Sequence, residues 1–129
     1  MKAIVQTVDG VFSVDLETEE VEPTDEGITP AAQPELSLPR VIAAAMSAST
    51  VVAAVARKPP LMLSYDAGAT WREAGSGLPP ARAVAIGENP DVVLYAARNR
   101  LFVSENGGIF WRALAVELPQ IEAVALREL

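Results

Sequence analysis

Arginine and lysine side chains are the groups in this sequence best suited to bind another molecule. A guanidinium or ammonium group carries a full positive charge and donates several hydrogen bonds, so a cluster of such groups binds carboxylates or phosphates. Most of the basic residues fall in short polar turns between apolar runs, where the side chain is free to meet a ligand. The candidates for anion binding are Arg40, Arg57, Lys58, Arg82, Arg98 and Arg100.

Carboxylates gather at the other end of the chain. Between Ala3 and Pro39 there are nine acidic residues and no basic one, and the whole chain carries a net charge of −7. This balance argues against non-specific binding of nucleic acid or of an anionic membrane. The run of glutamates from Glu17 to Glu22 offers ligands for a divalent cation, but runs of exposed acids are usually solvated surface. The sequence therefore predicts no metal site.

Two residue types that support much of enzyme chemistry are missing from the sequence, which has no Cys and no His. Their absence removes the usual zinc sites, haem ligation, a thiol nucleophile and a Ser-His pair. The first ten residues lack the apolar run of a signal peptide, and no apolar stretch reaches membrane-spanning length. We therefore expect a cytoplasmic protein without a cofactor.

An internal repeat of 40 residues organises the second half of the chain. The segment SYDAGATW at 64–71 aligns with SENGGIFW at 104–111, and Leu78-Pro79 aligns with both Leu118-Pro119 and Leu38-Pro39. Repeats of this length are typical of solenoids, propellers and arrays, in which each unit buries its apolar surface against the next.

Each repeat contains four short apolar runs separated by turn residues. In the unit at 81–120 the runs are 81–86, 92–97, 101–103 and 109–114. This pattern predicts a four-stranded antiparallel sheet with tight connections, which we call a blade. The runs do not alternate with polar residues, so both faces of each sheet should be buried against neighbouring sheets. Alanine-rich first strands and aromatic later strands fit the taper of a propeller blade.

The two aligned segments carry the basis for a family resemblance. SYDAGATW matches the pattern S-x-D-x-G-x-x-W, and SENGGIFW is a variant with Asn for Asp. The chain resembles the Asp-box, or BNR-repeat, β-propellers, which include sialidases and sortilin-type receptors. The motif is expected to stabilise the turn between the third and fourth strands, because Asp or Asn accepts from turn amides, Gly adopts positive φ and Trp covers the apolar edge. These structural residues are Ser64, Asp66, Gly68, Trp71, Ser104, Asn106, Gly108 and Trp111.

A third blade is split between the two ends of the chain. Residues 121–129 repeat the first strand of a blade, and residues 1–22 read as the remaining three strands. Ser13 and Asp15 align with Ser104 and Asn106, while Glu17 and Glu20 stand where Gly and Trp belong. The chain is thus one domain, 1–129, with blades at 41–80, at 81–120 and at 1–22 plus 121–129, and residues 23–40 are predicted to be an acidic, proline-containing surface loop.

Three blades are too few to surround a propeller axis, since propellers have about four to eight. A lone chain would leave a blade face and strand edges exposed. The sequence predicts a homodimer that forms a six-bladed ring, in which each chain gives strand 121–129 to the 1–22 blade of its partner. A dimer of open half-rings without strand exchange is the other arrangement considered, and assembly of three chains is disfavoured.

The propeller pattern places the six basic residues on one face. The turns between second and third strands and the segments leading into first strands share that face, with Asp9 and Glu122 as local acids. Three interpretations remain open. The residues bind an anionic ligand or an acidic segment of a protein partner, they are ordinary solvated turn residues, or the acidic residues of 19–35 cover them.

Catalysis is the alternative that the resemblance raises. Sialidases of this fold need an arginine cluster, a tyrosine paired with glutamate, an acidic general acid/base and an Arg-Ile-Pro motif, which is absent here. Tyr65 lies within the Asp box, and Tyr95 lies in an apolar strand. The favoured function is a non-catalytic binding or scaffold module without catalytic residues. The alternative is a degenerate or dimer-dependent glycoside hydrolase.

Overall fold

The computed structural model describes residues 1–28 and 36–128. These residues form twelve β-strands and no helix, so they contain no helix able to cross a membrane. The strands make three four-stranded antiparallel sheets, which confirms the predicted all-β class and the number of strands in each sheet.

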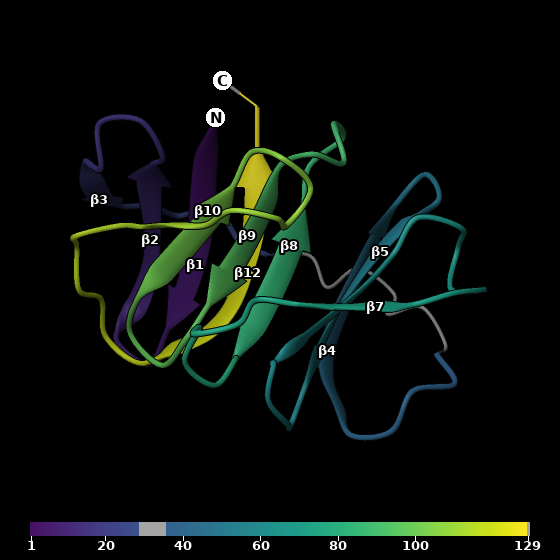
Figure 1. Cartoon of the computed structure of the whole chain (residues 1–129). Coiled ribbons are helices and arrows are strands. Elements are labelled where there is room, and N and C mark those ends of the chain that lie inside the picture. Colours follow the sequence, from purple (N-terminus) through teal and green to yellow (C-terminus); the bar gives the residue numbers. More distant parts are fainter. Residues whose placement is uncertain (29–35, 129) are drawn as a thin grey trace.

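Each sheet is one blade, and we number the blades by their order in space (Figure 1). Blade I contains β4 (Val41–Ser47), β5 (Thr50–Val55), β6 (Leu61–Ser64) and β7 (Arg72–Ala74). Blade II contains β8 (Ala83–Ile86), β9 (Val93–Ala96), β10 (Leu101–Ser104) and β11 (Arg112–Ala113). Blade III contains β12 (Ile121–Arg127), β1 (Lys2–Thr7), β2 (Gly10–Asp15) and β3 (Val21–Pro23).

The fourth strand of blade II is shorter than the sequence predicts. The apolar run 109–114 suggested a strand of six residues, but only Arg112 and Ala113 pair with β10. Ile109 and Phe110 belong instead to the preceding turn, where the Phe110 amide donates to the Asn106 side chain at 2.9 Å. Their apolar side chains are exposed, because the turn hydrogen bond holds this segment off the sheet.

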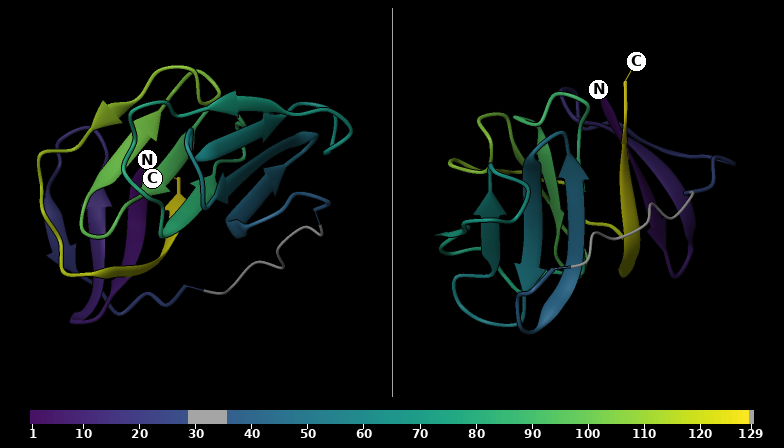
Figure 2. Two further views of the ribbon diagram at one scale, coloured as in Figure 1. Left: turned by 60° about the horizontal axis from the view of Figure 1, so that its bottom comes forward. Right: turned by 90° about the vertical axis from the view of Figure 1, so that its right-hand side faces the viewer.

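Blade II lies between the other two blades, and both views of Figure 2 show blades I and III at opposite ends. The first strand of blade II, β8, packs against both β4 and β12. One apolar cluster fills the boundary between blades I and II and contains Leu63 and Tyr95. Another fills the boundary between blades II and III and contains Val5 and Leu94. The apolar, non-alternating strands thus serve two sheet-to-sheet interfaces, as the sequence predicts for blade II.

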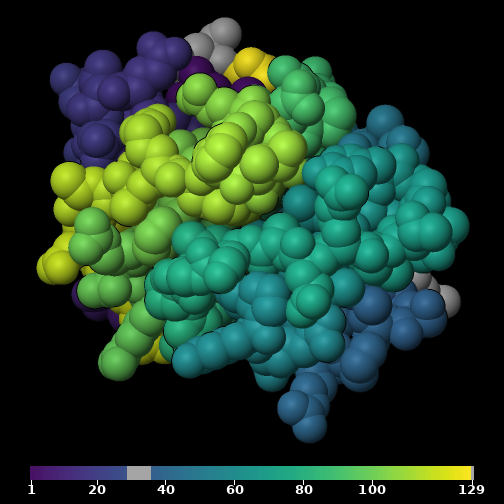
Figure 3. All heavy atoms as spheres, viewed as in Figure 1, coloured from purple at the N-terminus to yellow at the C-terminus, as the bar shows by residue number. Residues whose placement is uncertain are grey.

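Two side-chain hydrogen bonds also join blades II and III, between β11 with the segment after it and the turn after β2. Arg112 donates from Nη2 to the Leu16 carbonyl at 2.8 Å, and the Ala115 amide donates to the Glu19 side chain at 2.6 Å. In the space-filling view of Figure 3, the yellow-green segment around β11 accordingly lies against the purple residues of blade III. The last strand of blade II and the residues after it therefore reinforce the contact with blade III.

Blade III is completed by strands from both ends of the chain. β12 pairs antiparallel with β1 over most of its length, from Lys2 opposite Arg127 to Thr7 opposite Ile121. In the single chain this pairing is intramolecular, so the blade is completed without a strand from a partner. The predicted exchange of residues 121–129 between two chains stays a prediction.

The internal alignment of blade III is wrong by one residue in the sequence analysis. Phe12 pairs with Val5 as Phe102 pairs with Tyr95, so Val14, not Ser13, holds the strand position of Ser104. A slip of one residue places a side chain on the opposite face of a sheet. No serine hydroxyl therefore enters this turn. Instead the Asp15 carboxylate accepts from the amides of Glu17 and Thr18 at 2.8 and 3.0 Å.

Hydrogen bonds from the Thr18 and Glu17 amides, in that order, lower the pKa of Asp15 below its usual 3.8. By the strand pairing, Asp15 lies at the position of Glu105, one residue before Asn106. The third turn is therefore closed by a carboxylate from a different position than in the motif.

The connection predicted as a surface loop, 23–40, begins with Pro23 as the last residue of β3 and then contains no strand in its described parts. Residues 29–35 lie outside the described part of the chain. Leu36 and Leu38 are not free in solvent, because they pack against Ala53, Val55 and Met62 on the open face of blade I.

Candidate functional site

A basic groove opens on blade II, at the end of the sheet that carries the β9–β10 turn. It has a volume of about 750 Å³. Three segments build it, namely the approach to β8, the β9–β10 turn and the approach to β12. The lining residues are Pro79, Pro80, Ala81, Arg82, Ala97, Arg98, Asn99, Arg100, Phe102 and Gln120.

Backbone hydrogen bonds hold these three segments together. The Arg82 amide donates to the Ala96 carbonyl at 2.7 Å, and the Ile121 amide donates to the Arg98 carbonyl at 2.7 Å. The turn itself is closed by the Ala97 amide, which donates to the Arg100 carbonyl at 2.9 Å. The main chain beneath the arginines is thus fixed, while the side chains of Arg82 and Arg98 extend into solvent.

Arg100 differs from its two neighbours because it is partly buried. Its Nη2 donates to the Leu114 carbonyl at 2.9 Å. Among the described residues its Nε is buried without a hydrogen-bond partner. Arg100 therefore contributes positive charge to the groove and also ties the β9–β10 turn to the segment that follows β11.

One wall of the groove is apolar. Pro79, Pro80 and Phe102 contribute to it. The buried Tyr95 donates a hydrogen bond from its hydroxyl to the Pro79 carbonyl, and its ring makes edge contacts with Phe102 and Trp111. Burial raises the pKa of Tyr95 to about 12. The core tyrosine of the sequence analysis therefore braces the groove from beneath.

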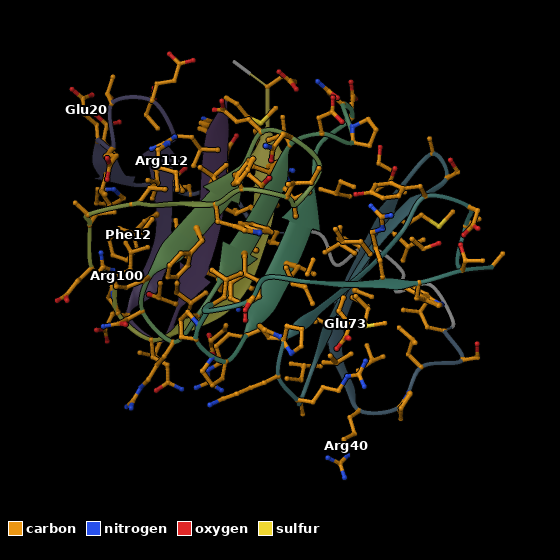
Figure 4. The ribbon with its side chains drawn as sticks, in the orientation of Figure 1. Phe12, Glu20, Arg40, Glu73, Arg100 and Arg112 are labelled. Atoms are coloured by element: carbon orange, nitrogen blue, oxygen red, sulfur yellow. The ribbon has the colours of Figure 1, made fainter. Side chains whose placement is uncertain are left out.

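The six predicted basic residues divide into two sets. Arg82, Arg98 and Arg100 line the groove, as the shared-face prediction requires. Arg40, Arg57 and Lys58 lie at the corresponding end of blade I, where the Ala56 amide donates to the Arg40 carbonyl at 3.0 Å. Arg57 directs Nη2 toward the Met62 sulfur at 3.1 Å. Figure 4 shows Arg40 and Arg100 projecting from different blades, so no single cluster gathers all six.

In the part of the chain that the structure describes, no carboxylate lines the groove. Asp9 and Glu122, the predicted local acids, are exposed and are not among its lining residues. Within residues 1–28 and 36–128, no group of three acidic, His or Cys side chains is arranged to hold a metal ion. Glycoside hydrolysis needs two carboxylates that converge on the bond to be broken. None of the described residues that line the groove is acidic.

The acidic residues considered as a cover for the basic face do not line the groove in the described structure. None of residues 19–28 lines it. Lys2 pairs with Glu26 at 3.6 Å, on blade III instead. The rest of the acidic segment, 29–35, lies outside the described residues.

Sequence reasoning missed Asn99, Phe102 and Gln120 as groove residues. Asn99 lies between Arg98 and Arg100, which were selected for their charge, and Phe102 follows the same turn. Once the sequence had predicted this turn, both residues could have been expected near the arginines. Gln120 precedes β12 as Pro80 precedes β8, and the 40-residue repeat was the signal that could have found it.

The turn motifs at 64–71 and 104–111 have matching hydrogen bonds. The Gly68 amide donates to Ser64 Oγ at 2.8 Å, and the Gly108 amide donates to Ser104 Oγ at 2.9 Å. The amide two residues after each glycine donates to the side chain of Asp66 or Asn106, at 2.8 and 2.9 Å. These hydrogen bonds account for the motif side chains by a structural role in the two turns.

Hydrogen bonds lower the pKa of Asp66 to about 2. The largest contribution comes from the Thr70 hydroxyl, followed by the Ser64 hydroxyl and the Thr70 amide. Each motif tryptophan packs beside its turn. A Cβ on Gly68 would lie 3.4 Å from the Trp71 ring, and Trp111 Nε1 donates to the Gly108 carbonyl at 3.1 Å.

Comparison with solved structures places this arrangement in a known fold. One neighbour, "YCF48 bound to D1 peptide", is a β-propeller protein that superimposes with a TM-score of 0.53 at 15% sequence identity. The chain has the β-propeller fold. The match covers 91% of this chain, which spans only 37% of the neighbour's length. No model of a protein family matches the chain, and no curated protein matches it.

Proposed function

We propose that this chain is a non-catalytic binding module whose groove on blade II holds an acidic segment of a protein partner. One observation carries the proposal. Arg82, Arg98 and Arg100 come from two separate segments and meet along one groove, and no carboxylate of residues 1–28 or 36–128 lines it. The chain as a whole has a net charge of −7 and repels anions. An anion that binds is therefore selected by the local positive charge of the groove.

The chemistry of the groove favours a peptide over a simple ion. Guanidinium groups form paired hydrogen bonds with carboxylates, and two exposed arginines provide two such positions. The wall of Pro79, Pro80 and Phe102 suits an apolar side chain between acidic ones. The structural neighbour YCF48 was solved with a bound peptide, which supports the same ligand class here as a proposal.

The finer family assignment is also a proposal. The serine, the aspartate or asparagine, and the glycine of the two turn motifs make the same hydrogen bonds in both copies, which supports the resemblance to Asp-box propellers. We further propose that the module acts as a six-bladed homodimer, so that two grooves share one ring. A cytoplasmic location remains a prediction from the sequence.

Fluorescence anisotropy tests the proposed ligand. The probe is a labelled peptide of alternating glutamate and leucine, compared with the same peptide carrying glutamine in place of glutamate. We expect the glutamate peptide to bind at least tenfold more tightly, with an affinity that falls as salt rises. Loss of both exposed arginines in Arg82→Ala/Arg98→Ala should remove most of this binding.

A matched variant guards against a general effect of charge. Arg57→Ala/Lys58→Ala removes the same charge from exposed positions of blade I, outside the groove. It should bind the glutamate peptide as the unmodified chain does. Equal weakening by both variants, or equal binding of the two peptides, would overturn the groove as an acidic-peptide site.

A further inference from the structure

The two interfaces inside the chain are built on the same pairing of small and large side chains. On β4, Ala43 and Ala45 share a cluster with Val84 of β8. On β8, Ala83 and Ala85 share a cluster with Val124 of β12. We call β4, β8 and β12, the first strands of the three blades, the inner strands. In each case two alanines of one inner strand leave room for larger aliphatic side chains of the next inner strand, so the strands pack closely.

A third alanine pair lies on β12 without a following blade. Ala123 and Ala125 occupy the positions of Ala43 and Ala45 two repeats along, and both are only partly buried. They pair with Gln6 and Ile4 of β1, which face the same way. Ile4 is buried within the single chain, yet none of these four residues belongs to the apolar cluster between blades II and III.

The complementary half lies at the other end of the molecule, on blade I. Ala53, Val55 and Met62 form a small cluster with Leu38 and Trp71. In blade II, Ala53 and Met62 correspond by strand pairing to Tyr95 and Phe102, and Leu38 and Trp71 correspond by the 40-residue repeat to Leu78 and Trp111. These four counterparts all belong to the cluster between blades I and II. Blade I thus presents the surface with which blade II binds its neighbour. Among the described residues no sheet packs on it, although Leu36 and Leu38 of the connection cover its small cluster.

The inner strand of that surface carries an exposed methionine. Met46 is 50% exposed, whereas Ile86, at the same position of blade II, packs in the cluster between blades I and II. Met46 is thus half exposed to water at the position where Ile86 is packed. An exposed apolar side chain at such a position indicates a missing partner surface.

We propose that these two end faces bind a second copy of this chain, which specifies the contacts of the homodimer proposed above. The face of blade III around Ala123 and Ala125 receives blade I of the copy, and blade I receives blade III of the copy. Because each chain then uses both ends, the assembly closes with two-fold symmetry into a ring of six blades, within the range that propellers adopt. No strand needs to be exchanged, and the ring does not depend on what the groove binds.

The occupant we commit to is a second copy because both faces repeat interfaces that the chain already makes with itself. The chain's own connection contributes at each end, through Leu36 and Leu38 on blade I and through the Lys2–Glu26 pair on blade III. Leu38 is equivalent to Leu78, which lies within the interface of blades I and II, so its position on blade I is compatible with a packed neighbour.

Light scattering coupled to size exclusion tests the ring on the intact chain. We expect a mass twice the 13.6 kDa of one chain. Met46→Asp and Ala125→Arg should each give the mass of one chain, because each damages one member of both contacts in a closed ring. Ile109→Asp is the control, since Ile109 is 62% exposed on the middle blade, and it should keep the doubled mass.

Mixing the two damaging variants separates a lost interface from a lost fold. The Met46→Asp chain keeps its blade III face and the Ala125→Arg chain keeps its blade I face, so an equimolar mixture has one undamaged contact. The mixture should regain a species of doubled mass that neither variant forms alone. A 13.6 kDa intact chain at every concentration, a doubled mass in both variants, or a mass that grows without limit would each overturn the ring.

Discussion

Asp66 accepts two hydrogen bonds from Thr70, one from its amide at 2.8 Å and one from its hydroxyl at 2.5 Å. Ser64 adds a third at 2.7 Å. This carboxylate closes the turn between β6 and β7 in the ionised form, because an ionised carboxyl group only accepts hydrogen bonds. Asn106 closes the equivalent turn of blade II as a neutral group.

The first prediction is an acid-sensitive contribution to stability from Asp66. Its folded-state pKa of about 2 lies below the usual 3.8, so the contribution is present above pH 3.8 and is lost as the pH falls through about 2. Asp66→Asn should therefore show a smaller drop in urea midpoint between pH 5 and pH 2 than the unmodified chain. An unchanged drop would show that Asp66 does not carry it.

The second prediction concerns Gly108, where the backbone has φ of +91° and a Cβ would lie 3.0 Å from Leu63 Cδ1 of blade I. Gly108→Ala should lose free energy of unfolding through both backbone strain and crowding at the blade interface. Gly77 has φ of +89° with no atom within 4 Å of its Cβ position, so Gly77→Ala isolates the strain, about 1 kcal/mol. Urea unfolding should rank Gly108→Ala as the less stable variant.

The third prediction is a loss of stability in alkali that depends on Tyr95. Burial raises its pKa from 10.0 to about 12, so the stabilising protonated form is present below pH 10 and its contribution is lost as the pH rises through about 12. Tyr95→Phe should remove this alkaline loss. At neutral pH the same variant should lose about 1 kcal/mol, because the Pro79 carbonyl loses its donor.

Tyr65→Phe serves as the comparison, since Tyr65 lies exposed in a turn and donates to the Gly107 carbonyl of the neighbouring blade. It should retain the alkaline loss. If Tyr95→Phe and Tyr65→Phe unfold alike between pH 10 and pH 12, the buried hydroxyl is not its source.

The fourth prediction concerns Arg112, which links blade II to the Leu16 carbonyl of blade III at 2.8 Å. Arg112→Gln should lower the free energy of unfolding by about 1 kcal/mol. Arg72 holds the equivalent place in blade I but lies over the Tyr65 ring, 5.8 Å from its centroid, within blade I. Arg72→Gln should have the smaller effect in the same urea titration, and the reverse order would contradict the assigned link.

The sequence predicted only part of the groove, as its arginines show. The positions of Arg82, Arg98 and Arg100 in turns followed from the repeat, and so did the face on which they lie. Which of the six basic residues would meet depended on the spacing of the blades, because Arg57 and Lys58 lie in an equivalent turn one blade away. Sequence position cannot measure that separation.

The sequence by itself determined the blades. Periodic turns and apolar runs fixed where chain segments reverse, and the paired motifs fixed the turns from Ser64 and Ser104, because these interactions act within about ten residues. Only the tertiary structure decided the register of blade III, where Val14 replaces Ser13 facing blade II. It also decided which faces stay open, because a sheet face is covered or exposed according to neighbours distant in the chain.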